Sequence, residues 1–150
     1  KTNEEIDNFF NSLNANIIYS GDSACYNQTK DTIFLPPVNN FKNTESYYSV
    51  LSHEMIHWTA HESRINRDLS NRFGSVAYAM EELIAELGAA FLSAELGVTN
   101  KPRSDHASYI ATWLEVLRND KKAIFHAAAK AQQAVEWMKD KQTENLQAAA

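Results

Sequence analysis

The sequence predicts a single α+β domain that is mostly helical, with a small β-sheet or hairpin near its N-terminus and about five helices. Apolar residues recur at helical spacing through most of the chain after Asn43, and short runs typical of strands precede it. A chain of 150 residues, 44% of them hydrophobic, is also long enough to bury one core. We therefore expect residues 1–150 to form a single domain.

The N-terminal part is expected to hold one helix and all the strands. Thr2 and Glu5 have the spacing of a capping box, and apolar residues follow at helical intervals as far as Leu13. Three short strands are then expected, at residues 17–19, 24–26 and 32–35. The second and third strands are predicted to pair as a hairpin, which ends at Pro36 and Pro37.

Helices are expected over most of the remaining chain. Asn43 or Thr44 can cap the first of them, and Gly97 is suited to end a longer one. The expected ranges are about 44–62, 76–96, 106–117 and from residue 121 onward. Residues 63–75 are polar and irregular, and we expect the arginines in this segment to pair with nearby acids.

Composition and charge exclude several classes of protein. The formal net charge of −5 argues against a domain that binds nucleic-acid phosphates by itself. The chain has one cysteine, Cys25, and hence no intramolecular disulfide; it also lacks the long apolar run of a membrane-spanning helix. The first residues contain no signal-peptide core and do not begin with Met. We therefore expect a cytoplasmic fragment of a longer protein that does not bind membranes.

The strongest chemical signal is the segment His53-Glu54-Met55-Ile56-His57, which is an HExxH motif. On a helix the two histidines lie on one face, so both imidazoles can bind the same metal ion. Zn²⁺ is the expected ion, because it suits neutral imidazole and keeps an open position for water. Glu54 is predicted to act as the general base, taking a proton from that water.

A catalytic zinc ion needs a third protein ligand. His61 lies about 12 Å from His53 along a helix axis, too far to share the ion without a break in the helix. Glu82 and Glu86 lie one turn apart on the next long helix, among apolar residues where an unpaired carboxylate is costly. We predict that Glu82 binds the metal and that Glu86 holds a ligand histidine through its second ring nitrogen, with the reverse assignment left open.

Transition-state stabilisation requires a hydrogen-bond donor close to the developing oxyanion. We prefer His106 for this catalytic role because it falls on the helix expected after the long one. Tyr109 lies one turn further along that helix, and Tyr48, Tyr78 and His61 are further options.

Several segments around the motif resemble a known family. The stretches SHEMIHWTAHESRINRDL, FGSVAYAMEELIAELGAAFLSAELG and SDHASYIATWLEVLRNDKKAIFHAAAKAQ are similar to the metallopeptidase domain of ArdC-type antirestriction proteins. Related domains occur in TraC-like plasmid primases and in polyvalent proteins of mobile elements. The resemblance implies a gluzincin-like zincin fold encoded by bacteria or their mobile elements, and its E-x-x-A-E spacing implies that Glu82 binds zinc. It also implies that an N-terminal domain binding single-stranded DNA precedes this one in the full-length protein.

These observations predict a zinc-dependent metallopeptidase domain of an antirestriction-type protein, with one Zn²⁺ per chain and a peptide or protein substrate. The extended segment 32–35 is expected to supply an edge strand with which a substrate can pair. Contact with single-stranded DNA is expected only through the separate N-terminal domain. The alternative is a non-catalytic, zinc-containing module that protects DNA or binds a partner in antirestriction.

Overall fold

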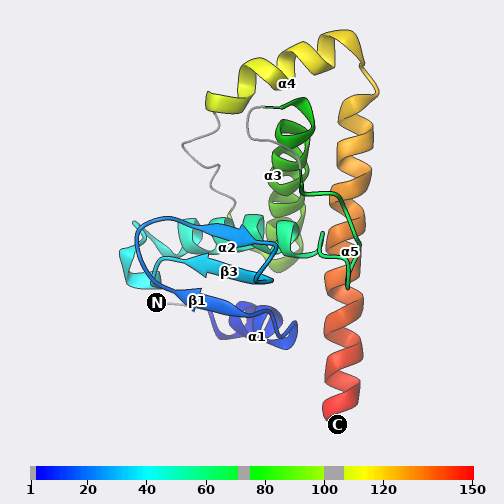
Figure 1. Cartoon of the computed structure of the whole chain (residues 1–150). Coiled ribbons are helices and arrows are strands. Elements are labelled where there is room, and N and C mark those ends of the chain that lie inside the picture. Colours follow the sequence, from blue (N-terminus) through cyan, green and yellow to red (C-terminus); the bar gives the residue numbers. More distant parts are fainter. Residues whose placement is uncertain (1–2, 71–74, 100–106) are drawn as a thin grey trace.

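The structure is a computed structural model that describes residues 3–70, 75–99 and 107–150. Within these ranges five α-helices, one short 3-10 helix and one small sheet are present, so the predicted fold class, α+β and mostly helical, is confirmed (Figure 1). In chain order the elements are α1 (Glu4–Ser12), β1 (Ile17–Tyr19), β2 (Cys25–Asn27), β3 (Thr32–Leu35), η1 (Val38–Asn40), α2 (Thr44–Trp58), α3 (Val76–Leu96), α4 (Ala107–Asn119) and α5 (Ala123–Ala149).

Side-chain caps determine where the first three helices begin. Asn3, Asn43 and Ser75 each accept a hydrogen bond from the backbone N–H three residues further on, at the starts of α1, α2 and α3. The start of α1 therefore differs from the prediction, because Asn3 is the cap rather than the predicted Thr2, which lies outside the described residues.

Helix α2 ends at Trp58, short of the predicted end near Glu62, because the chain folds back on the helix terminus. The Arg64 side chain donates a hydrogen bond to the carbonyl of Trp58 at 2.7 Å. The backbone N–H of Ile65 donates to the carbonyl of Thr59 at 2.8 Å. These two bonds satisfy carbonyl groups that a longer helix would have used.

The sheet has the strand order β1-β3-β2, so β3 is its central strand. The predicted hairpin is confirmed, because β2 pairs antiparallel with β3 and places Cys25 opposite Phe34. On its other side β3 pairs in parallel with β1, with Ile17 opposite Ile33. The expectation that residues 32–35 form an edge strand is therefore wrong: this segment is the most buried strand and pairs on both sides. Among the strands that the structure describes, β1 and β2 lie at the two edges of the sheet.

Helix α2 lies between the sheet and α3, and α3 in turn packs against the long helix α5 (Figure 1). Helix α4 contacts α3 and α5 at the end of the molecule away from α1. Fully buried side chains from β3, α2 and α5 form the centre of the core, among them Ile33, Leu35, Met55, Ile56 and Met138. Among the described helices, none combines the length and the apolar character that a membrane crossing requires.

Helices α2 and α3 pack tightly at Gly88. A Cβ atom at this position would lie 2.7 Å from both Cγ1 and Cδ1 of Ile56. Only a glycine fits here without displacing the isoleucine. The close approach keeps the acidic face of α3 beside the histidines of α2.

Candidate metal centre

The two motif histidines lie one turn apart on α2 and are both buried. His53 is 1% exposed and His57 is 8% exposed. Their Nε2 atoms are 3.2 Å apart, because residues four apart on a helix project from the same face. Both Nε2 atoms therefore point to one position between α2 and α3.

Glu82 on α3 meets this position from the opposite helix. Its Oε2 lies 3.0 Å from Nε2 of His53, and its Oε1 lies 3.1 Å from Nε2 of His57. One ligand atom from each of these residues falls within 4.8 Å of the others, close enough to hold a metal ion. Two imidazoles and one carboxylate are a donor set that divalent transition metals accept.

Two further carboxylates lie behind the histidines, at their Nδ1 atoms. Glu86 Oε1 is 2.7 Å from Nδ1 of His53, and Glu81 Oε2 is 2.8 Å from Nδ1 of His57. An Nδ1–H that donates to a carboxylate leaves Nε2 free to bind metal. The structure thus brings together His53, His57, Glu82 and Glu86, which the sequence singled out, and adds Glu81.

Sequence reasoning missed Glu81 although it adjoins Glu82 in the same acidic run. Adjacent residues on a helix point about 100° apart, so Glu81 and Glu82 cannot occupy the same position. Here that divergence places Glu82 between the two rings and Glu81 behind His57. The sequence did contain a signal for this second contact, namely two adjacent acids whose side chains must point in different directions.

The carboxylates also set the charge of the site. Burial lowers the pKa of His53, but its hydrogen bonds with Glu82 and Glu86 outweigh that effect and raise it. Burial likewise opposes the charged form of His57, yet Glu81 and Glu82 raise the pKa of this group to about 10. Burial raises the pKa of Glu81 and Glu82, whereas the contacts with the histidines lower both below the usual value. Ionised carboxylates around two imidazoles favour a cation at this position.

Both described arginines of the loop after α2 pair with acids, as the sequence indicated. Arg64 forms an ion pair with Asp31 in the turn between β2 and β3, and its guanidinium lies 4.0 Å from the ring centroid of Trp58. Arg67 pairs with Glu81 at 2.9 Å. The first pair joins the sheet to α2, and the second reaches the metal centre.

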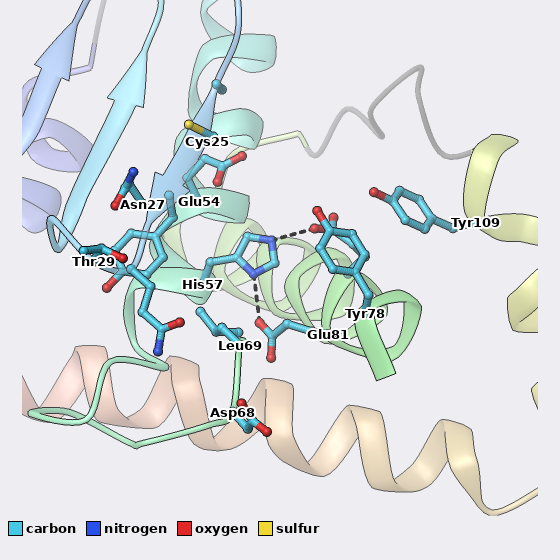
Figure 2. Close-up of a pocket in the computed structure, with 14 residues that line it drawn as sticks. Cys25, Asn27, Thr29, Glu54, His57, Asp68, Leu69, Tyr78, Glu81 and Tyr109 are labelled. Atoms are coloured by element: carbon cyan, nitrogen blue, oxygen red, sulfur yellow. Dashed lines mark hydrogen bonds and ion pairs between the residues drawn. The ribbon is translucent and has the colours of Figure 1, made fainter. Parts of the chain in front are cut away.

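A cleft of about 460 Å³ opens beside His57. One wall is the β2 edge, where Cys25 lies close to Glu54; the other wall carries Tyr78 and Tyr109 (Figure 2). The two tyrosine rings stack with centroids 6.2 Å apart. Glu54 is 2% exposed and lines this cleft next to His57. The cleft therefore gives access to the metal position between an edge strand and an aromatic wall.

The other candidates for transition-state stabiliser lie elsewhere or outside the described residues. His106, the preferred residue, is among the residues that the structure does not describe. His61 forms a hydrogen bond of 2.7 Å with Ser63 in the loop after α2. Tyr48 donates to Asp7 Oδ1 at 2.8 Å, which ties α2 to α1. Of the options described, only Tyr78 and Tyr109 line the cleft.

Comparison with protein families gives one match over most of the chain. A sequence model described as a zincin-like metallopeptidase matches residues 4–130. The uncharacterized protein y4eC of Sinorhizobium fredii (strain NBRC 101917 / NGR234) is 45% identical over 141 residues, covering 94% of this chain and 46% of that protein. A DNA primase TraC of Escherichia coli is 43% identical over 111 residues, covering 74% of this chain and 10% of the primase.

Two solved structures of the antirestriction protein ArdC from the R388 plasmid are also similar. The Mn(II)-bound structure has a TM-score of 0.86 and 38% identity, covering 95% of this chain and 53% of that one. The metal-free structure has a TM-score of 0.85 and 39% identity, covering 96% of this chain and 52% of that one. The chain thus spans about half the length of y4eC and of ArdC.

Proposed function

This chain belongs to the zincin-like metallopeptidase family, and on that basis we propose that it is a zinc-dependent peptidase domain of an antirestriction-type protein. The observation that carries the proposal is the convergence of His53, His57 and Glu82, of which His57 and Glu82 line a cleft together with Glu54. The donor set, the neighbouring acid and access for a substrate are the three requirements of metal-assisted hydrolysis.

His53, His57 and Glu82 are the residues that would hold the ion, and Glu81 and Glu86 would orient the two imidazoles. When bound, the ion would act as a Lewis acid toward the carbonyl group of the substrate and would make a water molecule at the site more acidic. Two histidines and one glutamate are a common set for catalytic zinc, which supports zinc as the ion. Because ArdC has been solved with Mn(II), manganese is the alternative in a metal analysis.

Glu54 is the proposed general base. Glu54 directly follows His53 on α2, and its side chain lines the cleft. Its carboxylate can therefore take a proton from the attacking water. The same carboxylate then passes that proton to the leaving amide nitrogen. His106 remains the proposed stabiliser of the oxyanion, and Tyr78 and Tyr109 are the alternatives that line the cleft.

The substrate is proposed to be an extended peptide segment of a peptide or protein. The free edge of β2 borders the cleft, so its backbone groups can pair with such a segment and hold it across the metal position. The pairing with substrate that was first expected of residues 32–35 is therefore proposed for β2 instead. For the longer protein we retain the proposal that a separate N-terminal domain binds single-stranded DNA.

The test compares the wild-type chain with Glu54→Gln. Metal content is measured by elemental analysis, and hydrolysis is followed by mass spectrometry on a mixed peptide library. We expect one zinc ion per chain in both proteins and a rate about 10²–10⁴-fold lower in Glu54→Gln, because the base is lost while the ligands remain. Glu45→Gln is the matched control, since Glu45 lies in the first turn of the same helix. This control should keep both metal and rate.

Two outcomes would contradict the proposal. Zinc binding without hydrolysis of any library peptide by the wild-type chain would favour the non-catalytic module. Hydrolysis that is equal in wild type and Glu54→Gln would point to a contaminating protease.

A further inference from the structure

Arg67 lies in the loop between α2 and α3, but its side chain is almost fully buried, with 8% exposed. The guanidinium donates to Glu81 twice, from Nε to Oε1 at 2.9 Å and from Nη2 to Oε2 at 3.2 Å. It also donates from Nη2 to the carbonyl of Ile56 at 2.7 Å and from Nη1 to Oγ1 of Thr59 at 3.0 Å. One side chain therefore joins the end of α2 to the acidic face of α3.

The carboxylate that Arg67 holds is the one behind His57. Oε2 of Glu81 takes hydrogen bonds from Arg67 and from Nδ1 of His57, the latter at 2.8 Å (Figure 2 shows the His57–Glu81 contact). A buried carboxylate is costly without a charged partner, and the guanidinium provides one. Glu81 can thus remain ionised and keep the proton of His57 on Nδ1. Without an ion, Nε2 of His57 donates to Glu82; with the proton of the neutral ring held on Nδ1, Nε2 is the atom that would bind an ion beside Glu82.

We infer that Arg67 is a positioning residue for the metal centre, which acts through Glu81 to hold His57 in the orientation and tautomer that bind a divalent cation. The inference rests on the proposed function, because it assigns the ion to that same site.

Arg64 provides a matched comparison within the same loop. Its guanidinium contacts Asp31, Tyr26 and Trp58, which belong to the sheet and to the end of α2. The side chains of both arginines are mostly buried, with 10% and 8% exposed, and both form ion pairs that fasten the loop. They differ in that the partner of Arg67 contacts a proposed metal ligand, whereas the partners of Arg64 do not belong to the group of residues able to hold the ion.

Charge alone and positioning predict opposite results when Arg67 is replaced. A nearby positive charge repels a cation, so removing it would tighten metal binding if the field of the arginine were all that mattered. If Arg67 positions His57, removing it leaves Glu81 unsupported and weakens binding. The sign of the change in affinity therefore separates the two roles.

The experiment measures Zn²⁺ affinity by competition with a fluorescent chelator, using the full chain and its Arg67→Met, Arg67→Lys and Arg64→Met variants. We expect Arg67→Met to weaken binding by about 10–100-fold, the usual effect of losing a residue that orients a metal ligand. Arg67→Lys retains the charge and part of the bonding, so its affinity should be intermediate. Arg64→Met should lose stability and keep its affinity. In ¹⁵N-detected spectra of the zinc-loaded proteins, where the ring of His57 is neutral, His57 should lose its single tautomer in Arg67→Met only.

The inference is overturned if Arg67→Met binds zinc as tightly as the wild type or more tightly, or if Arg64→Met weakens binding by the same factor. Should Arg67→Met fail to fold, Arg67→Lys decides the matter, because unchanged affinity in that variant equally contradicts the role. Failure of the wild-type chain to bind zinc would instead contradict the proposed function.

Discussion

Each histidine of the centre meets a carboxylate at both of its ring nitrogens, and the two sides have different chemistry. Glu82 faces both Nε2 atoms, where an ion would lie. Glu86 faces Nδ1 of His53, where it can only accept a hydrogen bond from the ring. A glutamine can take over the role of Glu86, because its amide oxygen also accepts a hydrogen bond. It is a poor substitute for Glu82, because a metal ion prefers a charged oxygen.

At the residue scale we therefore predict unequal effects of the two Glu→Gln substitutions. Glu86→Gln should reduce Zn²⁺ affinity by about 10-fold, at the low end of the range for residues that orient ligands. Glu82→Gln should reduce it much further, because a proposed ligand is lost. Competition with a chelator measures both affinities. A larger loss in Glu86→Gln would reverse the assignment of the two residues.

At the scale of the elements, the crossing of α2 and α3 depends on one small residue. Gly88 leaves room for Ile56, and the space between the helices is filled by that side chain. The acidic face of α3 is held at hydrogen-bonding distance from the histidines by this same packing. The geometry of the site is thus tied to packing between two helices.

Gly88→Ala should destabilise the protein by about 1–3 kcal/mol through overpacking, even though alanine gains roughly 1 kcal/mol in helix propensity. In an Ile56→Ala background the same change should become neutral or stabilising, because the clash is gone and the new methyl group fills space. Urea denaturation of the four proteins of this double-mutant cycle measures the coupling. Equal costs in both backgrounds would show that the contact does not limit the packing.

Gly97→Ala serves as the control for this cycle. Gly97 ends α3 with a φ of 72°, and nothing lies within 4 Å of where its Cβ would be. Its replacement should cost about 1–2 kcal/mol through backbone strain alone. That cost should be the same with isoleucine or alanine at position 56.

At the scale of the whole molecule, a bound ion would join two helices that no disulfide links, since the chain has a single cysteine. Helix α2 packs on the sheet, and α3 packs on α5. An ion bound by both helices would therefore add a link between α2 and α3, which already pack against each other at the centre of the molecule. Binding to the folded state alone stabilises that state by mass action.

Zinc at 100 times its dissociation constant should raise the free energy of unfolding by about 2.7 kcal/mol, and a chelator should remove this gain. His53→Gln should abolish the response, because a proposed ligand is lost. His126→Gln, which changes an exposed histidine on α5, should respond like the wild type. Chemical denaturation with and without zinc measures the gain. A full response in His53→Gln would place zinc binding elsewhere on the chain.

Local features of the sequence were sufficient to predict which segments form helices and strands. They were also sufficient to predict that the two histidines of the site share one helix face. The pairing of β2 with β3 and the end of α3 at Gly97 follow from turn and cap residues close in the chain. The shared face of His53 and His57 follows from helical periodicity, which no tertiary contact needs to supply.

The rest depends on contacts between residues distant in the chain. Helix α2 stops at Trp58 because the following loop satisfies its carbonyl groups, and β3 is central because β1 pairs with it in parallel. Periodicity placed Glu82 and Glu86 on one face, but it did not predict that Glu81 and Arg67 would meet His57. The sequence by itself determined the direction of side chains along each helix. Only tertiary packing decided which of them meet, because the distance and rotation between helices are set by their contacts, such as that of Gly88 with Ile56.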